Sequence, residues 1–218
     1  MNKKFKILQS ELKKGNVSVF LILFFVVILA LGLYYFTSKP KVASEKTLEQ
    51  QFSERLPALQ KEIETNPGSS ALRQELGVVK YAIGDIEGAK DAYEKGVELD
   101  SGNAVMHNNL GNTYRDLKDY VKAEAEYRTA MKINPKLTTS YMNLASVYNY
   151  ILSKPEVALS IYDEGIKANP TYVDFYNSKA LVYEQQGQKA KANEMFTKAL
   201  SVQPGNPAAT AGLARTKK

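Results

Sequence analysis

The chain has 218 residues and no cysteine, which excludes disulfide bonds, a thiol nucleophile and any metal site built on thiolates. Its formal charge is +6, but five lysines and one glutamate precede residue 17. Beyond them remain 24 of the 29 basic and 22 of the 23 acidic residues, so most of the chain is close to neutral. Because a nucleic-acid-binding face needs concentrated basic residues, we expect no nucleic-acid partner.

Residues 17–36 form an uncharged run in which Leu, Ile, Val and Phe predominate. A helix of this length is about 30 Å long, the thickness of the hydrocarbon core of a bilayer. Its apolar side chains favour insertion by roughly 5–8 kcal/mol. The sequence therefore predicts a single transmembrane helix that contacts the lipid bilayer. A cleaved signal peptide is the main alternative, although its apolar run is usually only about 7–15 residues long.

Lysines flank this predicted helix unevenly, with five before it and three closely after it, at Lys39, Lys41 and Lys46. Cytoplasmic flanks carry the excess of Lys and Arg. We therefore expect residues 1–16 to be a basic cytoplasmic segment and the rest of the chain to lie outside a bacterial inner membrane. Residues 37–46 are polar and predict a linker.

Residues 47–66 predict a helical lead-in to the domain that follows. Apolar residues recur there at helical spacing, namely Leu48, Phe52, Leu56, Leu59 and Ile63. Pro57 lies in the middle of this pattern, and proline removes a backbone donor from a helix. We therefore expect Pro57 to kink or split the helix.

Residues 67–204 repeat with a period of about 34 residues, a length typical of stacked helical units. One column of small residues is Gly77, Gly111, Ala145 and Ala180, and a second is Ala89, Ala123, Ala158 and Ala192. An aromatic column accompanies them, namely Tyr93, Tyr127, Tyr162 and Phe196. Each period can hold two antiparallel helices, in which facing small residues permit close approach and aromatics fill the space between neighbouring pairs. The pattern predicts four stacked helical hairpins, since one hairpin cannot bury its apolar stripe alone.

The turns and the end of the repeat region carry further signals. Gly84 and Gly187 suit turns in which a left-handed residue ends a helix. The third period holds one extra residue between Tyr148 and Ala158, where Ser153-Lys154-Pro155-Glu156 has the pattern of a capping box, so we expect a helix to begin there. Within residues 205–218, Asn206-Pro207 predicts the start of a C-terminal capping helix and a short tail.

The run Leu110-Gly111-Asn112-Thr113-Tyr114, followed by Ala123, Tyr127, Ala130 and Pro135, resembles the signature of the tetratricopeptide repeat family. The resemblance covers residues 68–204. It implies an all-α fold in which the transmembrane helix precedes a right-handed α-solenoid of four hairpins with a capping helix. It also implies a protein or peptide partner, held in a concave groove that the first helix of each hairpin lines.

Polar residues on the faces turned away from the packing columns are the predicted groove residues. They are Asn108, Asn109, Asn112, Arg115, Asn143, Ser146, Asn149, Tyr150 and Asn177. Asn109 and Asn143 occupy equivalent places, and the resemblance implies that they hydrogen-bond the backbone of the ligand. An amide suits that role because it both donates and accepts. A merely solvated helix face would show the same pattern, and Arg115 alone does not make a basic clamp for a carboxylate.

The sequence contains no recognisable catalytic motif. It has neither a glycine-rich phosphate loop nor a nucleophile elbow, and His107, the single histidine, lacks partner ligands at metal-binding spacing. We expect Asp91, Glu94, Glu124 and Glu126 to lie on solvated helix faces, with Lys or Arg neighbours three or four residues away. No enzyme activity, cofactor or metal is therefore predicted.

The predicted function is that of a membrane-anchored adaptor or scaffold that assists assembly of a membrane or envelope complex. Two alternatives stay open. One is a structural subunit that self-associates or packs laterally, and the other is a periplasmic chaperone-like holdase. The oligomeric state does not follow from the sequence.

Overall fold

The computed structural model describes residues 46–216, which belong to the second of two units of the chain. Within the described part all regular structure is helical, with ten α-helices and one π-helix, which confirms the all-α prediction. None of the helices there is long and apolar enough to cross a bilayer. The predicted cytoplasmic segment, the predicted transmembrane helix 17–36 and nearly all of the predicted linker lie outside the described residues.

The helices of the second unit follow one another in antiparallel pairs. After α3 (Leu48–Thr65), hairpin 1 comprises α4 (Ser70–Ala82) and α5 (Ile86–Leu99), and hairpin 2 comprises α6 (Ala104–Asp116) and α7 (Tyr120–Ile133). Hairpin 3 comprises α8 (Thr138–Ser146), the π-helix η1 (Val147–Ile151) and α9 (Pro155–Ala168). Hairpin 4 comprises α10 (Val173–Gln185) and α11 (Lys189–Val202), and α12 (Pro207–Thr216) follows.

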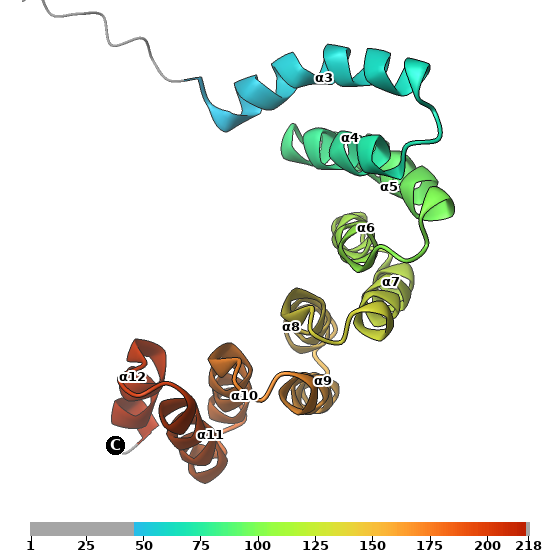
Figure 1. The fold of residues 1–218 in the computed structure, drawn as a ribbon. Coiled ribbons are helices and arrows are strands. Elements are labelled where there is room, and N and C mark those ends of the chain that lie inside the picture. Colours follow the sequence, from blue (N-terminus) through green and yellow to red (C-terminus); the bar gives the residue numbers. More distant parts are fainter. Residues whose placement is uncertain (1–45, 217–218) are drawn as a thin grey trace, which may run out of the picture. The chain divides into compact units, whose positions relative to one another are not determined.

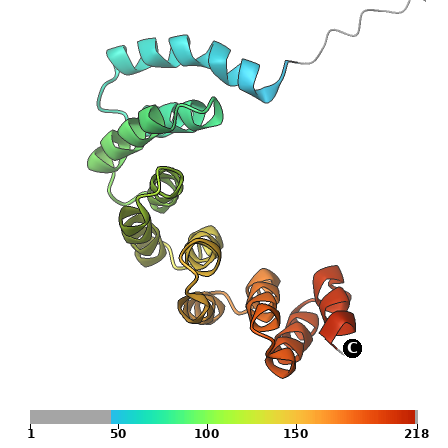
Figure 2. The same cartoon turned by 180° about the vertical axis from the view of Figure 1, so that it is seen from behind.

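These helices form a curved row within their unit. In Figures 1 and 2 the first helices of the hairpins, α4, α6, α8 and α10, lie on the inner side of the curve. The second helices, α5, α7, α9 and α11, lie on its outer side. The inner surface is therefore built from the first helices, as the sequence predicts.

Short polar side chains start several helices, because the first backbone N–H groups of a helix have no partner within it. Ser69, Asp85, Asn103 and Asp119 each accept a hydrogen bond from the N–H three residues further on. Asn206 does the same for Ala209 at the start of α12. These side chains fix where the five helices begin.

A left-handed residue ends the first helix of every hairpin. Its φ is 83° at Gly84, 64° at Lys118, 52° at Ser153 and 70° at Gly187. Because Ser153 forms this turn, its side chain does not cap α9, which follows Lys154 with no side-chain cap bond. The capping box predicted from the sequence is therefore wrong, and the extra residue of hairpin 3 is taken up by η1 instead.

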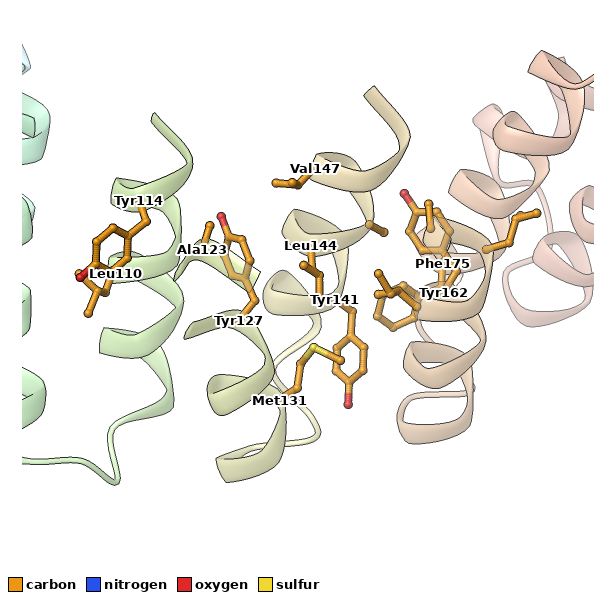
Figure 3. Close-up of a cluster of buried hydrophobic side chains, with 14 of the residues drawn as sticks. Leu110, Tyr114, Ala123, Tyr127, Met131, Tyr141, Leu144, Val147, Tyr162 and Phe175 are labelled. Atoms are coloured by element: carbon orange, nitrogen blue, oxygen red, sulfur yellow. The ribbon is translucent and has the colours of Figure 1, made fainter. Parts of the chain in front are cut away.

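The predicted packing columns lie in three hydrophobic clusters along the row, the largest of which extends from hairpin 1 to hairpin 4. Ala89, Ala123, Ala158 and Ala192 are all fully buried. Figure 3 shows Tyr127, Tyr141, Tyr162 and Phe175 among the side chains that connect successive helices. A Cβ atom added to Gly111 would lie 2.7 Å from the Tyr127 ring. The small residue at this position therefore makes room for an aromatic ring of the second helix.

The two ends of the row are covered by single helices. α3 continues through Pro57 without a break, so the predicted split does not occur. Its Leu59 and Ile63 pack against α4, while Arg55 contacts Glu62 and donates from Nε to Glu75 at 2.7 Å. At the other end, Ala209 of α12 is fully buried within a cluster that includes Phe196. Each end of the core is thereby shielded from water.

Candidate functional site

The nine predicted groove residues lie on four helical segments. Asn108, Asn109, Asn112 and Arg115 are on α6, Asn143 and Ser146 on α8, Asn149 and Tyr150 on η1, and Asn177 on α10. The structure divides them into residues inside the stack, residues in a hydrogen-bond network, and residues that are more exposed. Only the last two groups can present atoms to a ligand.

Asn108 and Asn177 lie inside the stack, with exposures of 7% and 6%. Asn108 Oδ1 accepts from Ser140 Oγ at 3.1 Å, and Asn177 Nδ2 donates to Asn206 Oδ1 at 3.2 Å. Both bonds reach the start of a later helix, α8 in one case and α12 in the other. In contrast to the prediction, these two residues join neighbouring units, because the following helix packs over their position.

A hydrogen-bond network fixes the amides of Asn112 and Asn143. Asn143 Nδ2 donates to Asn112 Oδ1 at 3.0 Å and to Asn108 Oδ1 at 3.2 Å. Asn112 Oδ1 also accepts from the Tyr127 hydroxyl at 2.8 Å. No hydrogen bond engages Asn112 Nδ2 or Asn143 Oδ1 among the described residues, so one donor and one acceptor are left on half-buried side chains. Such a pair matches the C=O and N–H of a peptide backbone.

A recess of about 250 Å³ lies between α4 and α6, next to this amide pair. Six residues line it, namely Val78, Tyr81, Ala82, Tyr93, Asn109 and Asn112. Val78 is 38% exposed although it is apolar. Burial raises the pKa of Tyr93, so its hydroxyl stays neutral at physiological pH. The recess therefore offers an apolar wall with amides at its edge.

Arg115 is neutralised by an acidic neighbour at the border of the recess. Its Nε donates to Asp116 at 2.8 Å, and the Tyr81 hydroxyl donates to the same carboxylate. Burial alone would raise the pKa of Asp116, but the hydrogen bonds from Arg115 and Tyr81 outweigh burial and lower it. Since this ion pair is complete, Arg115 is not a free anchor for the carboxylate of a ligand.

The remaining predicted residues do not join the network. Ser146 is half-buried on α8. Asn149 Nδ2 donates to Gln185 Oε1 of α10 at 3.0 Å, and Tyr150 is 61% exposed. The structure therefore brings residues of α6 and α8 together, and leaves those of η1 beside α10.

Hairpin 1 contributes residues to the recess that were not predicted from the sequence. Val78 and Tyr81 stand one period before Asn112 and Arg115 respectively. The spacing that predicts Asn112 and Arg115 on the inner surface therefore also predicts Val78 and Tyr81 there. Tyr93 was assigned only to a packing column, yet its buried ring also forms a wall of the recess.

The other candidate groups have structural partners. His107 is 8% exposed, and its Nδ1 lies 2.6 Å from Glu126 Oε2. Tyr114 donates to Glu94 and Tyr148 donates to Glu124. These three carboxylates are therefore not merely solvated, because each also binds a side chain of an adjacent helix. The predicted basic neighbour is confirmed for Glu124, which accepts from Arg128 Nε at 2.7 Å. Within residues 46–216 no cluster of potential metal ligands is present.

Paired helices that stack in register define this domain as a helical-hairpin repeat protein. Residues 71–103, 104–137 and 161–192 match models of the tetratricopeptide repeat. The chain therefore contains tetratricopeptide repeats, as its sequence predicts. The stretch 138–160, which includes η1, lies between the second and third matches. None of the curated proteins matches the chain.

Solved structures share this fold at low sequence identity. A crystal structure of MamA is 24% identical with a TM-score of 0.62, over 75% of this chain and 95% of that chain. Pseudomonas aeruginosa pilF is 20% identical with a TM-score of 0.62, over 76% and 75% of the two chains. YrrB, described as a TPR protein with an unusual peptide-binding site, is 21% identical with a TM-score of 0.55, over 73% and 81%.

Proposed function

We propose that the chain is a protein-interaction scaffold that holds an extended segment of a partner protein against α4, α6 and α8. The observation that carries this proposal is the fixed amide pair of Asn112 and Asn143 beside the recess that Val78 and Tyr81 line. The peptide-binding site ascribed to YrrB, which has the same fold, supports it further.

The partner segment in this proposal is uncharged where it meets the recess. Its backbone pairs with Asn112 Nδ2 and Asn143 Oδ1, and one apolar side chain enters the recess beside Val78. A buried apolar side chain contributes about 1.5–3 kcal/mol and each hydrogen bond about 0.5–1.5 kcal/mol. Since ordering the ligand offsets part of this gain, these contacts alone support only weak, roughly millimolar binding. Further contacts along the row, or confinement near the partner, must supply the remaining binding free energy.

A membrane anchor would provide such confinement. We propose that residues 17–36 span the inner membrane, with the N-terminus in the cytoplasm and the repeat domain outside. The support is the uncharged apolar run and the lysines before it. Protease added to intact spheroplasts should digest the repeat domain. Protection until the membrane is broken would reverse this topology.

Site-specific photo-crosslinking in native membranes tests the scaffold proposal. A photoreactive amino acid at Val78 should capture a partner, and the same group at Leu99, which is 48% exposed at the end of α5, should not. Asn109→Ala should reduce the capture at position 78 while leaving the melting temperature unchanged. Capture from position 99 alone would favour lateral packing, and equal capture of many unfolded chains would favour a holdase.

A further inference from the structure

A second recess, which we call the turn-edge recess, lies where hairpins 2 and 3 make their turns. Its volume is about 390 Å³. Tyr120, Val121, Tyr148 and Leu152 form its apolar part, and Lys118 and Lys154 stand at its border. These residues come from the start of α7, from η1 and from the two turns, and none of them belongs to the recess between α4 and α6.

The apolar part of the turn-edge recess has a floor and an exposed rim. Tyr120, Tyr148 and Leu152 are half-buried and pack against the hydrophobic core. Val121 is 82% exposed in the first turn of α7, more than any other exposed large apolar residue of the described part. An apolar side chain in that position contributes almost nothing to the stability of the fold. A partner that covered Val121 would gain binding free energy from burying it.

The charge left uncompensated around the turn-edge recess is positive. Glu124 is occupied by the Tyr148 hydroxyl and by Arg128 Nε, the latter at 2.7 Å. Asp119 caps α7 and lies 3.7 Å from Lys122 Nζ. Within residues 46–216 neither Lys118 nor Lys154 takes part in an ion pair. An acidic partner would therefore meet two available ammonium groups.

The backbone around the turn-edge recess is unusual on both sides. Lys118 and Ser153 have φ values of 64° and 52° and are the only non-glycine residues with positive φ in the described part. Hairpins 1 and 4 place Gly84 and Gly187 at the same turn. The π-helix η1 supplies Tyr148 to the recess wall. Strained residues and π-turns occur preferentially at functional sites, although each costs stability.

We propose that the turn-edge recess binds an acidic segment of a partner protein through an apolar side chain. That side chain covers Val121 and Leu152, and flanking carboxylates pair with Lys118 and Lys154. The occupant differs from that of the inner surface, where Arg115 is already paired with Asp116. The scaffold then holds two segments that differ in charge, one uncharged and one acidic.

Peptide titration followed by NMR tests this proposal on the full-length chain in a mild detergent. The probe is the peptide acetyl-Asp-Glu-Leu-Leu-Glu-Asp-amide, and its counterpart carries lysines in place of the four acids. The acidic peptide should shift backbone amides within 118–124 and 148–154, and the basic one should bind at least tenfold more weakly. Lys154→Glu should weaken the acidic peptide about fivefold, because it replaces an exposed attraction by a repulsion.

Lys132→Glu, an equally drastic change on the exposed side of α7, is the matched control and should leave the affinity unchanged. Val121→Ser should reduce binding without lowering the melting temperature. Equal affinity of the acidic and basic peptides, shifts confined to residues such as Val78 and Asn109, or no shift within 118–124 and 148–154 would each overturn the proposal. The scaffold proposal is tested at Val78 and Asn109, and the proposal for the turn-edge recess at other residues, so either proposal can fail without the other.

Discussion

Tyr114 of hairpin 2 and Tyr148 of hairpin 3 stand one period apart, yet their hydroxyl groups donate to carboxylates at different positions. In hairpin 2, Tyr114 donates from α6 to Glu94 of α5. In hairpin 3, Tyr148 donates from η1 to Glu124 of α7. The true equivalent of Glu94 in hairpin 2 is Arg128, one period later, so Tyr148 contacts a residue one helical turn nearer to the start of α7.

The difference shows that a polar contact between hairpins can change its partner while the buried columns persist. Ala145, which precedes η1, and Ala158 and Tyr162, which follow it, are all buried as in the other hairpins. The extra residue is absorbed within η1 because a π-turn accommodates one more residue than an α-turn. The apolar columns therefore determine how the hairpins stack, and the polar side chains take whichever partner is then within reach.

The largest expected effect concerns the packing that both hairpins share. Gly111→Leu should lower the free energy of unfolding by roughly 3 kcal/mol, because the new side chain meets the Tyr127 ring. Thermal and urea unfolding followed by circular dichroism measure this change. Gly68→Leu is the control, since nothing lies within 4 Å of its added Cβ. A Gly111→Leu protein as stable as the parent would show that the ring does not pack there.

Deleting Ile151 should restore a regular α-helix in hairpin 3 and separate Tyr148 from Glu124. Losing a hydrogen bond to a charged group costs about 1.5–3 kcal/mol, so we expect the free energy of unfolding to fall by about 2 kcal/mol. Tyr148→Phe in the full-length parent is the control for the bond alone. A deletion variant with unchanged stability and unchanged NMR signals of the η1 amides would show that the contact between Tyr148 and Glu124 does not depend on the extra residue.

Asn109 and Asn143 occupy equivalent positions in the two hairpins but have different surroundings. Asn143→Ala removes hydrogen bonds of 3.2 and 3.0 Å and should cost about 1–2 kcal/mol of unfolding free energy. Asn109→Ala should cost less than about 0.5 kcal/mol. Equal effects of the two substitutions in urea unfolding would show that the network between α6 and α8 contributes nothing to stability.

The contact in hairpin 3 should also respond to acid. Burial would raise the pKa of Glu124, but the hydrogen bonds from Tyr148 and Arg128 outweigh it and lower the pKa below its ordinary value of 4.5. The carboxylate therefore stabilises the fold fully above about pH 5, and this contribution of less than about 1 kcal/mol disappears as the pH falls through the lowered pKa. The free energy of unfolding, measured from pH 6 to pH 3, should fall less steeply in Glu124→Gln than in the parent.

The turns should show small effects of opposite sign. Lys118→Gly and Ser153→Gly should each stabilise the protein by about 0.5 kcal/mol, since relief of left-handed strain exceeds the entropy that glycine loses on folding. Gly84→Ala should destabilise it by about 1 kcal/mol for the converse reason. The melting temperatures of the three variants, each compared with that of the parent, give the sign and the size of each effect. A destabilised Lys118→Gly protein would mean that the lysine side chain, and not its backbone, determines this turn.

Periodicity was sufficient to predict the hairpins, their core and the inner surface, because packing residues such as Gly111 and Tyr127 must recur wherever helices stack. It could not separate Asn108 from Asn109, since both face away from the core columns of their own hairpin. The burial of Asn108 depends on Ser140 in the next hairpin, and the exposure of Asn109 on the recess beside α4. Polar contacts between hairpins carry no period, so the roles of Glu94 and Glu124 also escaped prediction.

Arg55 and Glu62 on α3 have a consequence for how the repeat domain can grow. They stand one period before Ala89 and Gly96, where the interior of the row has small residues. Here they form an ion pair in which Arg55 also contacts Glu75. Docking another helix on this face would strip water from these charges, and the attraction between them repays that desolvation poorly. We therefore expect no further helix to dock on the face of α3 that carries this ion pair.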